Sequence, residues 1–235
     1  MKLFLLYTSI FSLFFLFSCD SEKPEQDKTV NKQIGVQNEK KIGEDSSIAN
    51  DLHLSNDTIT ITQKVLIKTS KGDILIGLYG EDAPKTVENF LGLVRKRYYD
   101  GILFHRVAKN FLIQTGDRNT RFKSKRDEWG KGGRSIYGEP FEDEINPKSN
   151  VYRIGYQPGT VAMANRGPNT NTSQFFICLD EARDLEMRWT IFGRVLNGMS
   201  VVREINASEI VPGPFEPNDG IPVKPIKILR IKLIR

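Results

Sequence analysis

The chain has 235 residues, of which 39% are hydrophobic and 27% charged, and its formal net charge is +5. This composition is typical of a soluble globular protein, and the length allows one domain of ordinary size plus extra segments. The positive excess is modest and the lysines are scattered, which argues against a nucleic-acid-binding protein.

Residues 1–18 have the pattern of a bacterial lipoprotein signal peptide. Lys2 supplies a positive start, and residues 3–17 are almost entirely apolar but short for a membrane-spanning helix. The segment ends on Leu16-Phe17-Ser18-Cys19, which resembles the lipobox, where signal peptidase cuts before a cysteine that becomes lipidated. We therefore expect a lipid anchor on Cys19 and a domain outside the cytoplasm, in the bacterial cell envelope. An uncleaved anchor helix and an ordinary signal peptide are the alternatives.

Residues 19–57 are expected to form a flexible polar tether that begins at the lipidated Cys19. From Asp20 to Asp57 the chain is rich in Lys, Glu, Asp, Asn, Gln and Ser, so it cannot bury enough apolar surface to offset the entropy of ordering. The remaining residues, 58–235, form the predicted folded domain. The second cysteine, Cys178, follows an apolar run and is interpreted as a buried structural residue.

The domain is predicted to begin and end on β-strands. Pro84 suits the first turn of a helix whose apolar residues share one face, Val87, Phe90, Leu91 and Val94. A second helix is predicted at 200–205. Strands are predicted at 59–62, 65–69, 74–79, 103–107 and 225–234. Because the first and last strands are both β-rich, closure into a barrel is favoured, which would remove exposed edges.

Two runs have the composition of a site, because each mixes fixed polar groups with bulky apolar neighbours. They are FHRVAKNFLIQTGD at 104–117 and MANRGPNTNTSQFFI at 163–177, and a third block is GGRSIYG at 132–138. Together they resemble the active-site signature of the cyclophilins, the peptidyl-prolyl cis/trans isomerases, over about residues 65–233. The resemblance implies a mainly β fold, an eight-stranded antiparallel closed barrel capped by two α-helices, with the site on its outer face.

The same resemblance implies an isomerase that accelerates rotation about X–Pro bonds, and the expected lipid anchor on Cys19 makes exported or envelope proteins its expected substrates. Arg106 matches the family's catalytic arginine, and Gln114 matches the glutamine that orients this arginine and binds the substrate backbone. A donor at the prolyl nitrogen would stabilise the twisted transition state, so neither a cofactor nor a metal is required. The expected partners are proline-containing polypeptides, bound by a monomer.

Eight further residues match substrate-binding positions of the family. Those expected to line the proline pocket are Phe111, Leu112, Phe176, Leu185 and Trp189. Those expected at the substrate main chain, on the N-terminal side of the proline, are Ala164, Asn165 and Gln174. Taken alone, each apolar residue would be assigned to a core, so the pocket assignment depends on spacing from Arg106 and Gln174.

Three positions depart from the family pattern. Leu112 replaces the usual methionine at similar volume. Trp189 stands where many members carry histidine or tyrosine, and it can still close the pocket wall. Asp184 stands where cyclosporin-sensitive members carry a tryptophan, so we expect cyclosporin to bind weakly.

Residues 118–129 form a mostly basic loop that is longer than the corresponding loop in single-domain relatives. The run is RNTRFKSKRDEW, with Phe122 and Trp129 among the charges. The simpler interpretation is a solvated loop with the two aromatic rings packed beneath it. The alternative is a lip beside the groove that favours acidic peptides.

His105 is expected to pack on the face opposite Arg106, because neighbouring residues of a strand alternate. It is the only histidine within 58–235, the other being His53. A Ser-His-Asp hydrolase or a site with several histidine ligands is therefore disfavoured. The alternative function is a proline-peptide-binding module or holdase chaperone that uses the same groove without turnover, but Arg106 and Gln114 favour an enzyme.

Overall fold

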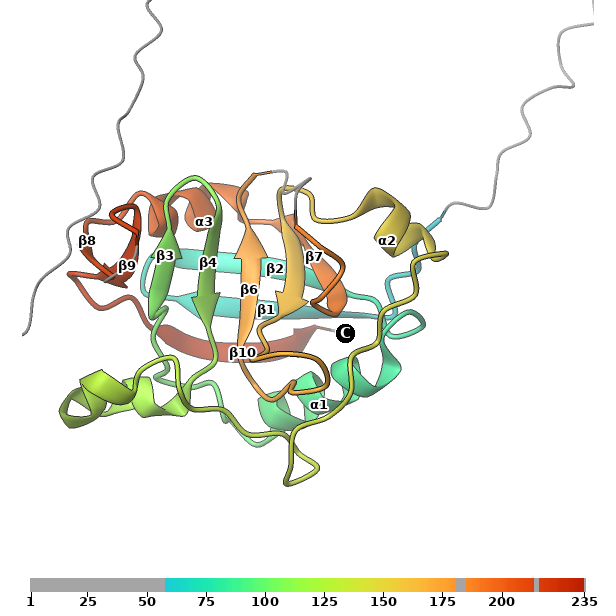
Figure 1. Ribbon diagram of the computed structural model, residues 1–235, viewed down its shortest axis with the longest axis horizontal. Helices are drawn as coiled ribbons and strands as arrows, with labels where there is room; N and C mark the ends of the chain where they lie inside the picture. The colour runs from blue at the N-terminus through green and yellow to red at the C-terminus, as the bar shows by residue number, and fades with distance from the viewer. Residues whose placement is uncertain (1–57, 181–184, 214–215, 235) are drawn as a thin grey trace, which may run out of the picture. The chain divides into compact units, whose positions relative to one another are not determined.

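The computed structural model describes residues 58–180, 185–213 and 216–234, and the domain is built on one antiparallel sheet (Figure 1). Its strands are β1 (Gln63–Thr69), β2 (Gly72–Leu78), β3 (Arg106–Ala108), β4 (Leu112–Thr115), β5 (Thr160–Met163), β6 (Phe175–Cys178), β7 (Ile191–Asn197), β8 (Ile210–Pro212), β9 (Asp219–Pro222) and β10 (Ile228–Ile234). The α-helices are α1 (Pro84–Arg95), α2 (Asn150–Ile154) and α3 (Met199–Asn206), and two 3₁₀ helices are η1 (Arg118–Arg121) and η2 (Lys123–Glu128). The predicted signal peptide 1–18, Cys19, the tether 19–57 and Asp184 lie outside the described residues.

The sheet is open, so the predicted eight-stranded closed barrel is wrong. Within the described residues ten strands follow the order β10-β1-β2-β7-β5-β6-β4-β3-β9-β8. β3 pairs with β4 on one side and with β9 on the other, so β9 occupies the edge through which β3 would have to pair with β10. Closure is approached by a bridge between Leu103 and Lys227 and by the amide of Gly101, which donates to the carbonyl of Ile228 at 2.7 Å.

The predicted cap of two helices is also corrected, because the described residues contain three α-helices. The additional one is the short α2, whose sequence NVYRI offers too few residues to show a helical period. The predicted helical face of α1, Val87, Phe90, Leu91 and Val94, is buried as expected. None of the helices in the described ranges is both long and apolar enough to cross a lipid bilayer.

The alternation of side chains gives the sheet two chemically different faces. Across β3, β4, β6 and β5, one row of paired residues is Val107, Ile113, Ile177 and Val161, and the adjacent row is Arg106, Gln114, Phe176 and Ala162. Cross-strand partners share a face, and neighbours along a strand point to opposite faces. The first row lies in the main core, and the second row lies on the opposite face, called here the outer face.

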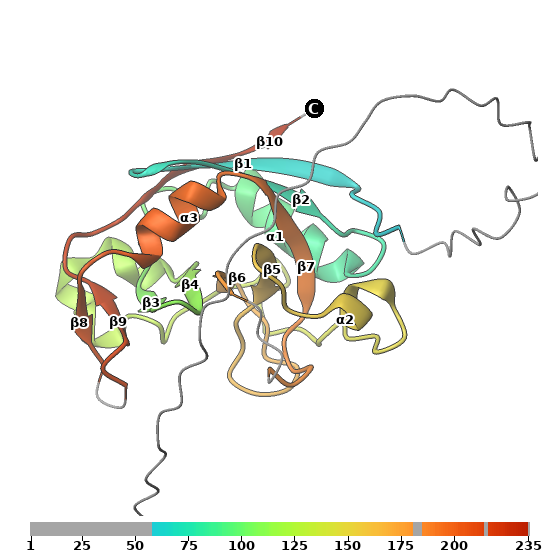
Figure 2. The same cartoon turned by 90° about the horizontal axis from the view of Figure 1, so that it is seen from above.

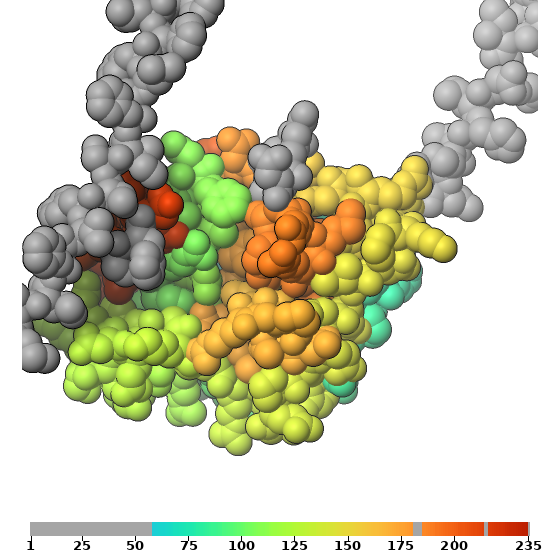
Figure 3. All heavy atoms as spheres, viewed as in Figure 1, coloured from blue at the N-terminus to red at the C-terminus, as the bar shows by residue number. Residues whose placement is uncertain are grey.

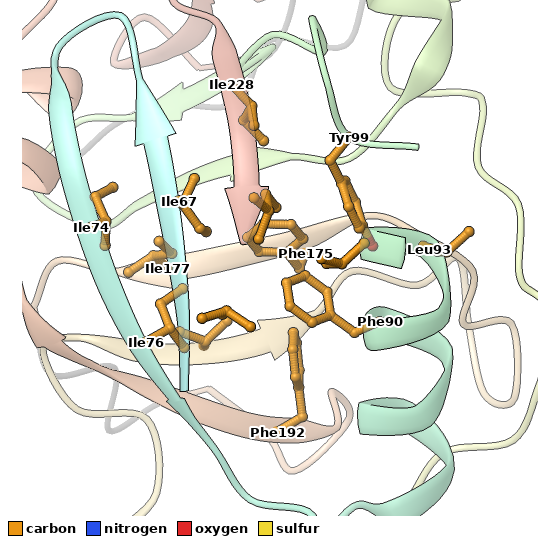
Figure 4. Close-up of a cluster of buried hydrophobic side chains, with 14 of the residues drawn as sticks. Ile67, Ile74, Ile76, Phe90, Leu93, Tyr99, Phe175, Ile177, Phe192 and Ile228 are labelled. Carbon is orange, nitrogen blue, oxygen red and sulfur yellow. The ribbon is translucent and has the colours of Figure 1, made fainter. Parts of the chain in front are cut away.

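The main core lies where the sheet folds back on itself, with β1, β2 and β10 behind β3, β4 and β6 (Figures 1 and 2). Phe90 of α1 enters this core and is almost completely buried (Figure 4). Its ring centroid lies 5.3 Å from that of Tyr99, 5.5 Å from that of Phe175 and 5.4 Å from that of Phe192. Phe90 therefore joins α1 to β6 and β7.

Replacing Phe90 with alanine should lower the free energy of unfolding by about 3–5 kcal/mol, because the ring contacts are lost and a cavity remains. Urea denaturation monitored by circular dichroism measures this change. Phe122→Ala, the same substitution at a side chain that is 50% exposed, is the control and should cost no more than about 0.5 kcal/mol. Equal losses at the two positions would contradict the central place of Phe90.

Candidate active site

Arg106 and Gln114 lie opposite each other in the β3–β4 hairpin. The register pairs them directly, and Nη1 of Arg106 donates to Oε1 of Gln114 at 3.1 Å. Asn110 in the connecting turn has φ 59°, a left-handed conformation that asparagine tolerates better than most residues. The structure therefore brings together the two residues that the sequence assigns to catalysis.

Gln174 orients Gln114 through a hydrogen bond in which Gln174 can only be the acceptor. Its Nε2 donates to the carbonyl oxygens of Gly130 and Gly132 at 2.9 and 2.6 Å, and a carbonyl oxygen can only accept. Oε1 of Gln174 therefore accepts from Nε2 of Gln114, at 2.9 Å. The other atom of the Gln114 amide, Oε1, therefore faces Arg106 and accepts a hydrogen bond from its guanidinium, which can only donate.

The hydrogen-bonded side chains of Gln174, Gln114 and Arg106 are called here the relay. Two buried residues support it. Oδ2 of Asp117 accepts from the backbone amides of Gly130 and Gly132 at 2.7 and 3.1 Å, which holds the loop that supplies the two carbonyls. His105 was predicted to pack away from the site, but its Nε2 lies 3.1 Å from Oε1 of Gln174. The reason is that β3 begins at the next residue, so strand alternation does not apply to His105. Burial lowers the pKa of its imidazole, which favours the neutral ring beside the relay.

Gly116 allows the end of β4 to approach the segment before β6. Its φ is +100°, and a Cβ atom at this position would lie 2.3 Å from the carbonyl oxygen of Ser173. The Ser173 hydroxyl donates to the Gly116 carbonyl at 2.8 Å. A side chain at Gly116 would therefore push Gln174 away from Gln114.

Asp219 holds the other side of the Arg106 guanidinium. It pairs with Ala108 in the β3–β9 ladder, which places it diagonally beside Arg106. Nε and Nη2 of Arg106 donate to Oδ2 of Asp219 at 2.9 and 2.6 Å. The two side chains are 43% and 24% exposed, so the pair contributes little to stability and serves mainly to position the guanidinium. Asp219 was not predicted from the sequence, because nothing near it in the chain points to Arg106.

The apolar residues predicted to line the proline pocket gather in one cluster on the outer face. Leu112 and Phe176 are nearly buried, whereas Phe111, Leu185 and Trp189 are partly exposed at the edge of the cluster. The Trp189 ring packs edge-on against Phe176, with centroids 6.2 Å apart. Figure 3 views the domain from the same side as Figure 1, with green atoms of the β3–β4 region beside orange atoms of the segment that leads into β7.

Two tyrosines hold the backbone at Trp189. The hydroxyls of Tyr152 and Tyr156 donate to the Trp189 carbonyl at 3.2 and 2.8 Å. Burial raises the pKa of Tyr156 to about 12, so this hydroxyl keeps its proton. Neither tyrosine was predicted from the sequence, since Tyr152 lies in α2 and Tyr156 follows it, where no helix was predicted.

A cavity of about 360 Å³ adjoins the relay at Gln174, and Ala164 and Asn165 line it. The Ala164 amide donates to the Gln174 carbonyl at 2.9 Å. Nδ2 of Asn165 donates to Oδ1 of Asp143 at 3.2 Å and to the Arg188 carbonyl at 2.9 Å. The three residues predicted to contact the substrate main chain therefore lie at one cavity, which we call the active-site cavity.

Cys178 lies in β6, and burial raises the pKa of its thiol to about 12. The thiol therefore stays protonated and is a poor nucleophile, which agrees with a structural role. In the ranges that the structure describes, no group of three or more His, Cys, Asp or Glu side chains is placed to hold a metal ion.

Known proteins of one family are similar to this chain. The family described as "Cyclophilin type peptidyl-prolyl cis-trans isomerase/CLD" matches residues 64–233. Peptidyl-prolyl cis-trans isomerase ppi1 of Schizosaccharomyces pombe is 43% identical over 166 residues, which cover 71% of this chain and 96% of that protein. The human peptidyl-prolyl cis-trans isomerase-like 3 is 40% identical over 166 residues, covering 70% of this chain and 94% of that protein.

Solved structures show the same likeness. A crystal structure of a cyclophilin type peptidyl-prolyl cis-trans isomerase from Cryptosporidium parvum has a TM-score of 0.62 and 34% identity, covering 74% of this chain and 98% of that one. The family match and the identities of about 40% both extend over nearly the whole described domain. The chain therefore belongs to the cyclophilin family of peptidyl-prolyl cis-trans isomerases.

Proposed function

We propose that Arg106 accelerates rotation about X–Pro bonds by donating a hydrogen bond to the prolyl nitrogen of the twisted transition state. The barrier of roughly 20 kcal/mol comes from resonance that gives the C–N bond partial double-bond character. Rotation removes this resonance and leaves a lone pair on a pyramidal nitrogen. A donor aimed at that lone pair binds the twisted state more strongly than either planar state, which lowers the barrier.

The hydrogen bonds of Arg106 carry this proposal. A guanidinium has five N–H donors, and Nη1, Nε and Nη2 each use one of them toward Gln114 and Asp219. Counting contacts between described residues, one N–H on each of the two Nη atoms remains for a substrate. The site thus supplies a permanently charged donor that is held on two sides.

The neighbouring apolar cluster supports a proline substrate. Its partly exposed members, Phe111, Leu185 and Trp189, provide a surface for a pyrrolidine ring. Excluding water there would strengthen the interaction between Arg106 and the imide. In this arrangement Ala164, Asn165 and Gln174, at the active-site cavity, contact the substrate main chain on the N-terminal side of the proline.

Arg106→Ala should lower kcat/KM by at least about tenfold, or roughly 1.4 kcal/mol of barrier, because the donor to the prolyl nitrogen is lost. A protease-coupled assay on a short Ala-Pro-Phe peptide measures this. Arg203→Ala, which removes an exposed arginine of α3, should leave the rate unchanged. Full activity of Arg106→Ala would refute the mechanism. Client protection by the wild type without turnover would favour the binding-module or holdase alternative.

Asp219→Asn should lower kcat by about threefold with little change in KM, because the guanidinium loses a charged partner that fixes its position. Asp219→Glu, which keeps the carboxylate, should restore part of the loss. The matched control is Asp73→Asn, which removes an exposed carboxylate 3.9 Å from Lys68. A change confined to the melting temperature would show that Asp219 is only structural.

We also propose that Cys19 is lipidated and anchors the domain outside the cytoplasm, in the bacterial cell envelope. The support lies in the sequence: a positive start at Lys2, an apolar run at 3–17, a lipobox-like ending at Cys19 and a polar segment at 20–57. Several acyl chains suffice for a durable anchor, since each buried CH₂ contributes about 0.8 kcal/mol. The substrates would then be exported or envelope proteins.

Cys19→Ser should abolish incorporation of a labelled fatty acid when the full chain is produced in a bacterium that processes lipoproteins. The protein should then leave the membrane fraction. Cys178→Ser, which removes the buried cysteine of β6, is the matched control and should keep both the label and the membrane association. Membrane association of unlabelled Cys19→Ser would instead support an uncleaved anchor helix.

A further inference from the structure

A second cavity lies beside the active-site cavity and is strongly basic. It has a volume of about 370 Å³ and lies between the C-terminal end of α1, η1 and the segment 134–138. In Figure 1, η1 and η2 are the yellow-green helices below β3 and β4. Five of the side chains that line the cavity are cationic, and none of its described lining residues is acidic: the cations are Lys96, Arg97, Arg118, Arg121 and Arg134.

Within the part of the chain that the structure describes, most of these cations lack a neutralising partner. Arg97 forms an ion pair of 3.0 Å with Asp100. Among the residues of known placement, Lys96, Arg118 and Arg134 form no ion pair. Like charges gathered around one hollow raise its potential and attract anions.

Arg121 is held in this cavity although a like charge opposes it. Its Nη2 donates to the carbonyls of Tyr98 and Arg97 at 2.6 and 3.3 Å, which fixes the guanidinium by backbone contacts that do not neutralise it. Burial and then the charge of Arg118 lower the pKa of Arg121. An anion between Arg118 and Arg121 would relieve this repulsion.

The basic cavity and the active-site cavity are neighbours. They share three lining residues, Arg134, Ser135 and Gly138. The active-site cavity is itself lined by Lys131, Arg134 and Arg166, with Glu139 as the one carboxylate among its described lining residues. A substrate segment bound at Ala164 and Asn165 therefore has a positively charged route toward the second cavity.

We propose that the basic cavity binds carboxylate side chains of the polypeptide substrate on the N-terminal side of the proline, so that the enzyme prefers acidic clients. This inference rests on the proposed isomerase function and on the proposed direction of the bound chain. The shared wall favours a substrate segment over a separate anionic partner, because a segment tethered to the active site is present at high effective concentration. In this proposal the basic loop at 118–129 contributes Arg118 and Arg121 to the binding of substrate carboxylates. Phe122 is half exposed, so its ring is not packed beneath the loop.

The test compares Ala-Ala-Pro-Phe peptides preceded by four glutamates or by four glutamines, an extension that spans about 13 Å. NMR exchange spectroscopy should measure isomerisation, because a coupling protease would respond to the charges itself. At about 20 mM salt, we expect kcat/KM to be at least about fivefold higher for the glutamate peptide, and we expect the ratio to approach one at about 0.5 M salt. Lys96→Gln/Arg118→Gln should abolish the preference and leave the glutamine peptide unaffected.

The control variant Lys64→Gln/Lys232→Gln makes the same change in net charge at exposed residues of β1 and β10 and should keep the preference. Four glutamates placed after the proline should give no advantage. Equal rates on the two peptides, or an equal loss of preference in both variants, would overturn the inference while leaving the isomerase function intact. Inactivity on both peptides would instead refute the proposed function.

Discussion

The carbonyl oxygens of Gly130 and Gly132 determine how Gln174, Gln114 and Arg106 are arranged. Because they accept hydrogen bonds and cannot donate them, the Gln174 amide has one satisfied orientation. That orientation sets Gln114, and Gln114 then presents an acceptor to Arg106. Flipping either glutamine would put donor against donor or acceptor against acceptor, at a cost of about 1–3 kcal/mol for each buried group left unpaired.

The same relay depends on the hydrophobic core through the register of the sheet. A slip of one residue in the β3–β4 pairing would exchange the faces of Arg106 and Val107, because side chains alternate with a period of two. The slip is opposed by the buried row on the inner face, Val107, Ile113, Ile177 and Val161. Packing on one face of the sheet therefore maintains the geometry of the site on the other.

The sequence predicted those parts of the site that local patterns determine. Arg106 and Gln114 are eight residues apart in one hairpin, and Pro84 with the apolar spacing after it located α1 to within a residue of its start. Asp219 could not be predicted, because it lies 113 residues from Arg106 and is one of 29 acidic residues. The prediction of a closed barrel was wrong for the same reason. Whether β3 pairs with β9 or β10 depends on contacts between distant segments, which strand propensity does not encode.

In the proposed function arginine serves two different purposes, and the difference between them lies in the partners of each side chain. Arg106 is paired with a carboxylate and an amide, so its position is fixed and its charge has a counterion on one side. Arg118, among the described residues, has no carboxylate partner, and the backbone carbonyls that hold Arg121 do not carry charge. A paired cation suits a reaction that needs a donor at one point in space. Unpaired cations around a cavity suit recognition of charge over a range of positions, which is what a substrate of variable sequence presents.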